Sequence, residues 1–211
     1  MSSQKKILVI ATGGTIESFY GADGDSGENA PYNVPQDKNS IIPDALKALD
    51  PNHKCDFYEA CQRDSKGVNS DILHHIALYI SQHASEYDGI VITHGTDTMP
   101  RNARALEDML ETIGVPPVPI VFTGSMIPLR DENKNWRKDS DGRENLKNAL
   151  EDVRRHDAGV HIRMGEFFVS ADKVDKSVEL NDDIKKPNNT VRHGEFVDYD
   201  PKRWQPLTPY S

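Results

Sequence analysis

Two segments of the sequence combine threonine and glycine in a way that suits acyl-transfer chemistry. Residues 11–16 read ATGGTI and residues 94–99 read HGTDTM, and an apolar run precedes each of them. A threonine hydroxyl becomes a nucleophile when a neighbouring base takes its proton and backbone N–H groups stabilise the developing oxyanion. Glycine-rich turns leave such N–H groups open to a ligand. The two segments therefore predict a hydrolase whose nucleophile is a threonine.

Purely structural roles are the alternative for both segments. Gly13 and Gly14 could serve only a tight turn with positive φ, and a threonine beside them could cap a helix. A phosphate-binding loop is a further alternative, but neither G-x-G-x-x-G nor G-x-x-x-x-G-K-[ST] is present there. Residues 94–98 favour chemistry, because they hold an imidazole, two hydroxyls and a carboxylate, whereas a cap needs only one of these groups.

Composition and charge narrow the class of protein. The chain has 211 residues, 36% of them hydrophobic, which suits one globular domain. Its net charge of −9 and the absence of basic runs interleaved with aromatics argue against nucleic-acid binding. The first apolar run is too short for a signal peptide or a membrane span, so we expect a cytoplasmic protein. Cys55 and Cys61 form no metal-binding pattern, which predicts two free thiols and no metal site.

Strand and helix patterns alternate along the chain, which predicts an α/β fold with a mostly parallel open sheet and helices on both faces. The apolar runs predict strands at residues 6–11, 55–60, 89–93, 118–123 and 159–164. Helical spacing predicts four helices: residues 43–49, a helix capped by Ser70, a helix with Thr98 as cap, Pro100 first and Gly114 as its stop, and a helix opened by residues 139–142. Ligands of such sheets gather outside the carboxyl ends of the strands, so both threonine segments can face one site.

Two regions lack this apolar periodicity. Residues 17–40 are rich in glycine, proline and polar side chains, and a loop of this length in a compact domain is usually functional, so we expect a lid there. From residue 181 the sequence turns polar and proline-rich, with Trp204 as its main apolar anchor. These patterns predict a catalytic domain over residues 1–180 and a tail over residues 181–211.

Taken together, the motifs give the chain a specific resemblance to the bacterial-type L-asparaginases, the amidohydrolases that release ammonia from asparagine. The resemblance extends from about Lys6 to Lys176 and is strongest at residues 11–16, 89–99, 123–128 and 140–149. It implies the fold of the asparaginase N-terminal domain, L-asparagine as the substrate, and a reaction without metal or organic cofactor.

The resemblance also implies roles for individual residues. Thr15 corresponds to the primary nucleophile, and Tyr32 corresponds to the tyrosine that acts as its base, for which Tyr20 is less suitably spaced. A tyrosine has an ordinary pKa near ~10, so its site must lower that value. Thr96 is similar to the threonine that activates and orients the attack, and Asp97 to the carboxylate that receives the substrate α-ammonium.

Further site residues follow from the same resemblance. Lys176 falls where the family has a lysine that pairs with the second threonine and passes its proton; a solvated lysine in a charged stretch is the alternative. Asp64 and Ser65 resemble the segment that binds the substrate α-carboxylate. Gly14 and Gly95 complete the expected substrate-binding set.

The chain also departs from the family pattern. Asp175 and Lys66 add charge where the family more often has polar residues. Family members commonly carry a second, C-terminal domain that contributes to a neighbouring subunit's site, and this sequence corresponds to a short form. We therefore expect a homo-oligomer, a dimer or a tetramer, and leave substrate preference and affinity open.

Two other functions stay open at this stage. A related amidohydrolase could act on glutamine or another amide. A non-catalytic module could instead bind an amino acid as a sensor. The joint presence of Thr15, Tyr32, Thr96, Asp97 and Lys176 argues against a sensor, which needs no nucleophile, base or proton carrier.

Overall fold

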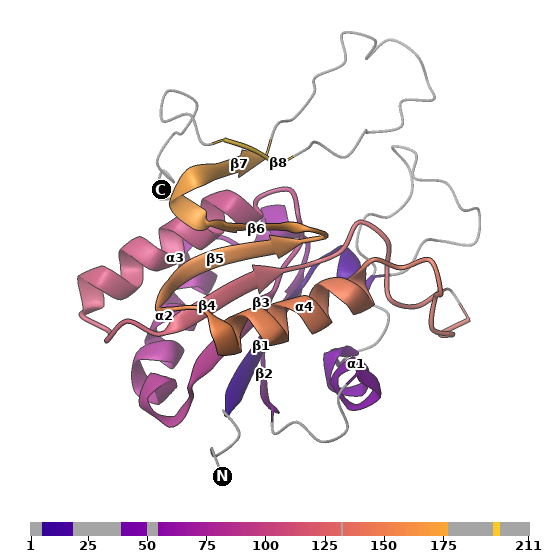
Figure 1. The fold of residues 1–211 in the computed structure, drawn as a ribbon, viewed down its shortest axis with the longest axis horizontal. Helices are drawn as coiled ribbons and strands as arrows, with labels where there is room; N and C mark the ends of the chain where they lie inside the picture. The colour runs from indigo at the N-terminus through magenta and orange to yellow at the C-terminus, as the bar shows by residue number, and fades with distance from the viewer. Residues whose placement is uncertain (1–5, 19–38, 50–54, 132, 177–195, 199–211) are drawn as a thin grey trace, which may run out of the picture.

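The computed structural model describes residues 6–18, 39–49, 55–131, 133–176 and 196–198. Its main element is a six-stranded sheet with the order β2-β1-β3-β4-β5-β6 (Figure 1). The first five strands in this order pair in parallel, and β6 pairs antiparallel with β5. The strands are β1 (Ile7–Gly13), β2 (Cys55–Arg63), β3 (Gly89–Thr93), β4 (Pro119–Thr123), β5 (Gly159–Met164) and β6 (Phe167–Ser170).

Helices cover both faces of this sheet. They are α1 (Ile42–Leu49), α2 (Ser70–His83), α3 (Met99–Ile113) and α4 (Gly142–Arg155). The short 3₁₀ turns are η1 (Thr15–Glu17), η2 (Ser65–Gly67), η3 (Ala84–Glu86) and η4 (Ala171–Lys173). The predicted α/β fold, a mostly parallel sheet with helices on both faces, is therefore confirmed.

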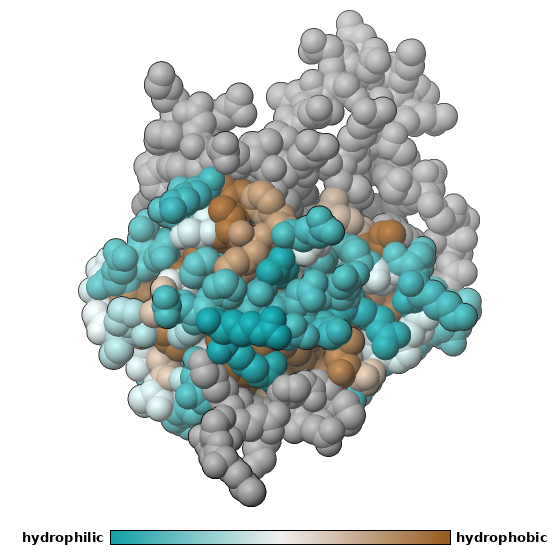
Figure 2. All heavy atoms as spheres, viewed as in Figure 1, coloured by the Kyte–Doolittle hydropathy of each residue, from teal (hydrophilic) through white to brown (hydrophobic). Residues whose placement is uncertain are grey.

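Two apolar cores explain this arrangement. In β1, Leu8 and Ile10 pack with α2 and α3, whereas Ile7 and Val9 pack with α1 and α4. Successive side chains of a strand point to opposite faces, so a strand buried on both sides carries a continuous apolar run. The outer face of α4, which crosses the front of the molecule, is hydrophilic (Figure 2). None of the helices in the described ranges is both long and apolar enough to span a bilayer.

The starts of α2 and α3 differ in detail from the predictions, whereas α4 begins at Gly142, within the segment 139–142 that was predicted to open it. Asn69, not Ser70, caps α2, because its Oδ1 accepts the Ile72 N–H at 3.1 Å. Thr98 does precede α3, but its hydroxyl makes no cap hydrogen bond, and Pro100 is the second helical residue rather than the first. Asp141 precedes α4, and its carboxylate accepts N–H groups from the loop after β4 instead of capping the helix.

The end of the described chain adds strands that the sequence did not predict. These are β6 and a two-stranded pair, β7 (Val174–Lys176) with β8 (Phe196–Asp198). β8 lies in the predicted tail and β7 lies within the predicted domain of residues 1–180, so part of that tail pairs with the domain. The predicted boundary at residue 180, the anchor Trp204 and residues 19–38 of the lid predicted over residues 17–40 lie outside the described residues.

Candidate active site

The order of the strands locates a switch point between β1 and β3. The chain passes from β1 to β2 on one side, and the next strand, β3, pairs with the other side of β1. Ligands of open α/β sheets bind outside the carboxyl ends of the strands at such a point. Residues 13–15, the first turn, follow β1 there, and residues 94–98, the second turn, follow β3.

Close backbone packing joins the two turns. Gly14 has φ +84°, and a Cβ at this position would lie only 2.4 Å from Cα of Gly95. A Cβ at Gly95 would in turn lie 2.8 Å from Cβ of Ser65. The Thr98 hydroxyl donates to the Ser65 carbonyl at 2.8 Å, which ties η2 to the second turn. Gly14, Gly95 and Ser65 therefore meet at the carboxyl edge of the sheet, as predicted, because two of them lack a side chain.

The first turn presents Thr15 at the start of η1. Thr15 is half-buried, whereas its neighbours Gly14 and Ile16 are buried. The Ser18 hydroxyl donates to the Gly14 carbonyl at 2.8 Å, and the Glu17 N–H bonds the same carbonyl at 3.1 Å. Hydrogen bonds from the residues that follow it thus hold the turn, and the Thr15 side chain stays accessible.

The second turn contains two candidate site residues, one of them buried and the other exposed. Thr96 is 5% exposed, whereas the side chain of Asp97 is 46% exposed. Asp97 lies 3.7 Å from the ammonium of Lys66, measured from Oδ2 to Nζ. The carboxylate predicted to receive an α-ammonium therefore already faces a cation, which the substrate would have to join or replace.

His94 supports the second turn from inside the protein. It is fully buried, and burial lowers its pKa to about 4, so it is neutral at physiological pH. Asn102 donates to its Nε2 at 3.0 Å, which leaves the proton on Nδ1, 2.6 Å from the Gly95 carbonyl. The imidazole that the sequence placed among the chemical groups of this turn thus positions Gly95.

Asp64 and Ser65 lie beside the second turn, but only one of them is buried. Ser65 is 3% exposed, and Asp64 is half-buried and caps η2 by accepting the Lys66 N–H at 2.7 Å. Gly67 N–H bonds the Asp64 carbonyl at 2.8 Å. Hydrogen bonds within the segment therefore hold this turn, and Ser65 is the member that packs against Gly95.

The structure describes the remaining predicted residues, Lys176, Tyr32 and Tyr20, less completely. Lys176 is the last residue of β7, where it pairs with Phe196 of β8. Arg104 of α3 donates to the Val174 carbonyl and, at 3.3 Å, to the Ala171 carbonyl, which holds the start of β7 against α3. Tyr32 and Tyr20 lie outside the described residues.

Sequence reasoning missed one group beside the first turn. Glu17 is 6% exposed and its carboxylate accepts the Gly13 N–H at 3.3 Å. Burial raises the pKa of this carboxyl to about 7, against the lowering effect of its hydrogen bonds. A charged residue directly after the TGGTI motif was the available signal. Within the described ranges no group of three or more His, Cys, Asp or Glu side chains could hold a metal ion, and Cys55 and Cys61 are free thiols.

Known L-asparaginases are similar to this chain in sequence and in fold. The L-asparaginase of Thermococcus kodakarensis is 32% identical over 178 residues, which cover 83% of this chain and 49% of that protein. L-asparaginase 1 of Escherichia coli K12 is 36% identical over 147 residues, covering 70% of this chain and 40% of that protein. The crystal structure of a probable cytoplasmic L-asparaginase from Campylobacter jejuni superposes with a TM-score of 0.62 at 26% identity, covering 84% of this chain and 50% of the other.

The chain matches only part of each of these relatives. It spans at most about half the length of the relatives compared above. The family model described as "Asparaginase, N-terminal" matches residues 6–196, which is most of the chain. The chain therefore belongs to the asparaginase family and corresponds to its N-terminal domain.

Proposed function

We propose that this protein is an amidohydrolase that converts L-asparagine to L-aspartate and ammonia, with Thr15 as the nucleophile. The observation that carries the proposal is the contact of Gly14 with Gly95, which brings the two threonine turns together at the switch point of the sheet. The relatives named L-asparaginase support the substrate class. A nucleophile on one turn and a binding carboxylate on the other are what such a reaction needs.

The proposed reaction proceeds through two acyl transfers. The Thr15 hydroxyl loses its proton to a base and attacks the side-chain amide carbon of asparagine. The C–N bond then breaks, ammonia leaves with a proton, and an aspartyl ester remains on Thr15. Water attacks this ester, releases aspartate and restores the hydroxyl. Backbone N–H groups of the glycine-rich turns would stabilise the oxyanion in both steps. The chemistry requires neither a metal nor an organic cofactor.

The other predicted residues take roles around this reaction. Asp97 would bind the α-ammonium, which would favour amides that carry one. Ser65 and Asp64 would bind the α-carboxylate end, beside Gly14 and Gly95. Thr96 would orient the attack. These roles are supported by the meeting of η2 with the second turn.

The resemblance to the asparaginases supplies the proposed roles of Tyr32 and Lys176. Tyr32 would act as the base for Thr15, and Lys176 would pass a proton at Thr96. The placement of β7 against α3, the helix that follows the second turn, supports a role for Lys176.

Assembly and location form part of the same proposal. We expect a homo-oligomer, a dimer or a tetramer, as the resemblance to the asparaginases implies. Light scattering of the purified protein would reveal this, and a strict monomer would contradict it. The cytoplasm is the proposed compartment, as for the probable cytoplasmic L-asparaginase of Campylobacter jejuni. Fractionation of cells that express the chain would test that location.

Ammonia release from L-asparagine by the purified protein tests the proposal. We expect Thr15→Ala to abolish turnover and Thr15→Ser, which keeps a hydroxyl, to retain part of it. Thr112→Ala is the matched control, because that hydroxyl bonds the Asp108 carbonyl on the exposed face of α3. Mass spectrometry after an acid quench should find an aspartyl adduct on the peptide that contains Thr15.

Other results would favour the alternatives. Faster ammonia release from glutamine than from asparagine would assign a different amide preference. Calorimetric binding of asparagine without turnover in the wild type would indicate a sensor and contradict the enzymatic proposal.

A further inference from the structure

Glu17 is a buried carboxylic acid within two residues of the proposed nucleophile. Its Oε1 accepts the Gly13 N–H at 3.3 Å, so it contacts the first turn directly. Its Oε2 accepts a short hydrogen bond from the Ser40 hydroxyl. Ser40 also donates its backbone N–H to Glu59 of β2 at 2.7 Å, and its Oγ accepts the Ile42 N–H of α1 at 3.2 Å. Glu17 therefore joins the first turn to the segment that precedes α1.

Within the described residues no ion pair neutralises Glu17. Of the titratable groups described there, Glu59 and the Cys61 thiol face it, both on β2, and Glu59 disfavours its ionisation. Arg63 pairs with Gly13 at the end of β2 but is exposed. From the segment that leads into α1, the Ser40 hydroxyl and the Ile41 N–H bond the carboxylate. Burial and these surroundings raise its pKa to about 7, so both protonation states are populated at neutral pH.

We propose that Glu17 is a positioning residue for the proposed nucleophile Thr15, and that its neutral form is the state in which the first turn is active. This inference rests on the proposed function, because it concerns the same reaction. The hydrogen bond to Gly13 fixes the turn in either state, since a carboxylic acid still accepts through its carbonyl oxygen. The charge, however, differs between the two states.

The charge that develops during the reaction indicates which protonation state of Glu17 is the active one. Attack by Thr15 develops negative charge on the oxyanion beside the turn. An ionised Glu17 would repel that charge across a water-poor region, and a neutral Glu17 would not. Turnover should therefore fall as pH rises through about 7, the pKa of Glu17. At an effective dielectric constant of about 20 and a separation of roughly 10 Å, the repulsion lowers kcat on the order of tenfold.

The test compares pH profiles of kcat and KM for ammonia release between the wild type and Glu17→Gln. Glutamine can accept the Gly13 N–H and donate to Ser40, but it carries no charge at any pH. We expect the ratio of the wild-type kcat to that of Glu17→Gln to fall about tenfold between pH 6 and pH 8.5, with KM little changed. Glu17→Ala, which loses both hydrogen bonds, should lower kcat at every pH.

Glu107→Gln supplies the matched control. Glu107 of α3 also accepts a backbone N–H, from Val160 at 3.2 Å, and burial also raises its pKa. Because Val160 belongs to the start of β5, this carboxylate lies away from the first turn. Its pH profile should follow that of the wild type. If Glu17→Gln and the wild type gave superimposable profiles, the proposal would be wrong.

A measurement without substrate separates this inference from the proposed function. In ¹⁵N–¹H spectra, the Gly13 amide of the wild type should shift with a midpoint near pH 7, and this titration should vanish in Glu17→Gln. If the wild type released no ammonia but showed this titration, the proposed function would fail while the contact of Glu17 with the turn would stand. If the Gly13 amide did not titrate with Glu17, the positioning role would be overturned.

Discussion

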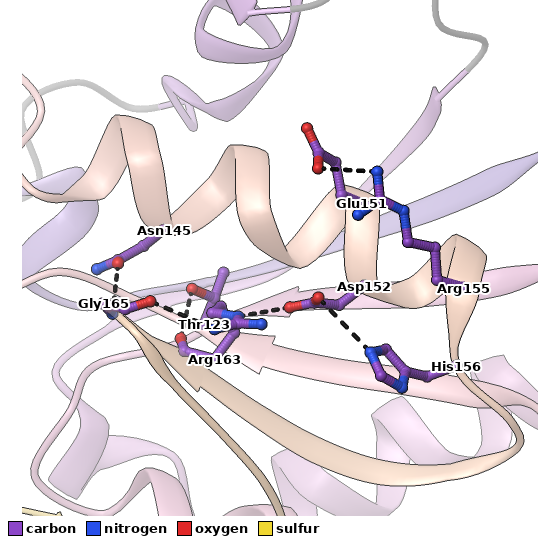
Figure 3. A network of polar contacts seen from close by, with 8 residues as sticks. All are labelled: Thr123, Asn145, Glu151, Asp152, Arg155, His156, Arg163 and Gly165. Atoms are coloured by element: carbon purple, nitrogen blue, oxygen red, sulfur yellow. Dashed lines mark hydrogen bonds and ion pairs between the residues drawn. The ribbon is translucent and has the colours of Figure 1, made fainter.

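Two buried carboxylates of this protein are held in opposite ways. Asp152 of α4 is 7% exposed, and Arg163 of β5 donates to it through Nε at 2.5 Å while His156 lies 3.8 Å away (Figure 3). Glu17 is 6% exposed, and its partners within the described ranges are neutral N–H and hydroxyl groups. One carboxylate is paired with a cation beside a charged surface, and the other is buried without one beside the proposed nucleophile.

The comparison distinguishes a structural ion pair, at Asp152, from a carboxyl group that can respond to pH, at Glu17. The network of Asp152, His156 and Arg163 adjoins a cavity of about 430 Å³ lined mainly by charged side chains of α4 and β5. Anion and cation hold each other in a fixed geometry there. Within the described residues Glu17 has no such ion pair, and its protonation can change without loss of its hydrogen bonds. Perturbed groups of the second kind concentrate at functional sites.

The largest expected effect comes from Gly14→Ala in the first turn. The added Cβ would lie 2.4 Å from Gly95 Cα at φ +84°, so two backbone segments must separate. Strain and overpacking together should lower the free energy of unfolding by about 4 kcal/mol and abolish turnover. Gly114→Ala is the control: φ is +78°, but nothing lies within 4 Å of the added Cβ, so a loss of about 1 kcal/mol is expected. Urea unfolding of both variants measures the difference, and equal losses would contradict the close packing of the two turns.

Asp152→Ala should have the next largest effect on stability. It leaves Arg163, whose side chain is 14% exposed, without its anion, which should cost about 3 kcal/mol of unfolding free energy. Glu151→Ala on the same helix breaks the exposed pair with Arg155 and should change stability by less than about 0.5 kcal/mol. Chemical denaturation checks both values.

A double variant sharpens this prediction. Asp152→Leu combined with Arg163→Met removes both charges and should recover most of the lost stability. If the double variant were as unstable as Asp152→Ala, packing rather than the ion pair would explain the effect.

The sequence predicted those features that short segments determine. The strands β1, β3 and β4 follow from buried apolar runs, and the meeting of the two turns follows from the position of each turn at a strand end. The edge strand β6 was missed, because four residues after a two-residue hairpin carry little pattern. Asn69 and Ser70 are adjacent residues that both suit a helix cap, and only the backbone geometry chooses between them.

Functional roles were harder to predict, because they depend on burial by distant segments. Glu17 is buried next to Ser40 and near Glu59, which the sequence separates from it by 23 and 42 positions. His94 has the residue type of a catalytic base, yet it bonds Asn102 of α3 and is enclosed. The charge of Glu17 beside the first motif is visible in the sequence, but its burial and that of His94 are not. A sequence motif alone therefore could not separate the supporting residues from those that face the substrate.

The pH dependence of stability tests Glu17 directly, with an intermediate expected effect. Its pKa in the folded state is about 7, above the ordinary value of 4.5. Between these values the folded protein keeps a proton that the unfolded chain has released, so stability is lost as pH rises from about 4.5 to 7. This loss amounts to about 3 kcal/mol at 1.36 kcal/mol per pH unit.

Glu17→Gln should remove that part of the dependence. Its stability relative to the wild type should therefore increase between pH 4.5 and pH 7 and change little above it, as measured by urea unfolding at each pH. Glu144→Gln, which removes an exposed carboxylate of α4, provides the comparison and should run parallel to the wild type. A parallel curve for Glu17→Gln would mean that Glu17 is not buried as described.

The smallest effect on stability, but an informative one on binding, is expected from Lys66→Gln. The pair of Lys66 with Asp97 is exposed, so its loss should change the unfolding free energy by less than about 0.5 kcal/mol. If Asp97 receives the α-ammonium, Lys66 competes with the substrate for this carboxylate, and its removal should lower the KM for asparagine a few-fold with kcat unchanged. Arg155→Gln, which breaks a similarly exposed pair beside the α4 network, should alter neither constant. A raised KM in Lys66→Gln would instead show that the ammonium of Lys66 binds the substrate carboxylate, and the competition would then be the wrong account of this contact.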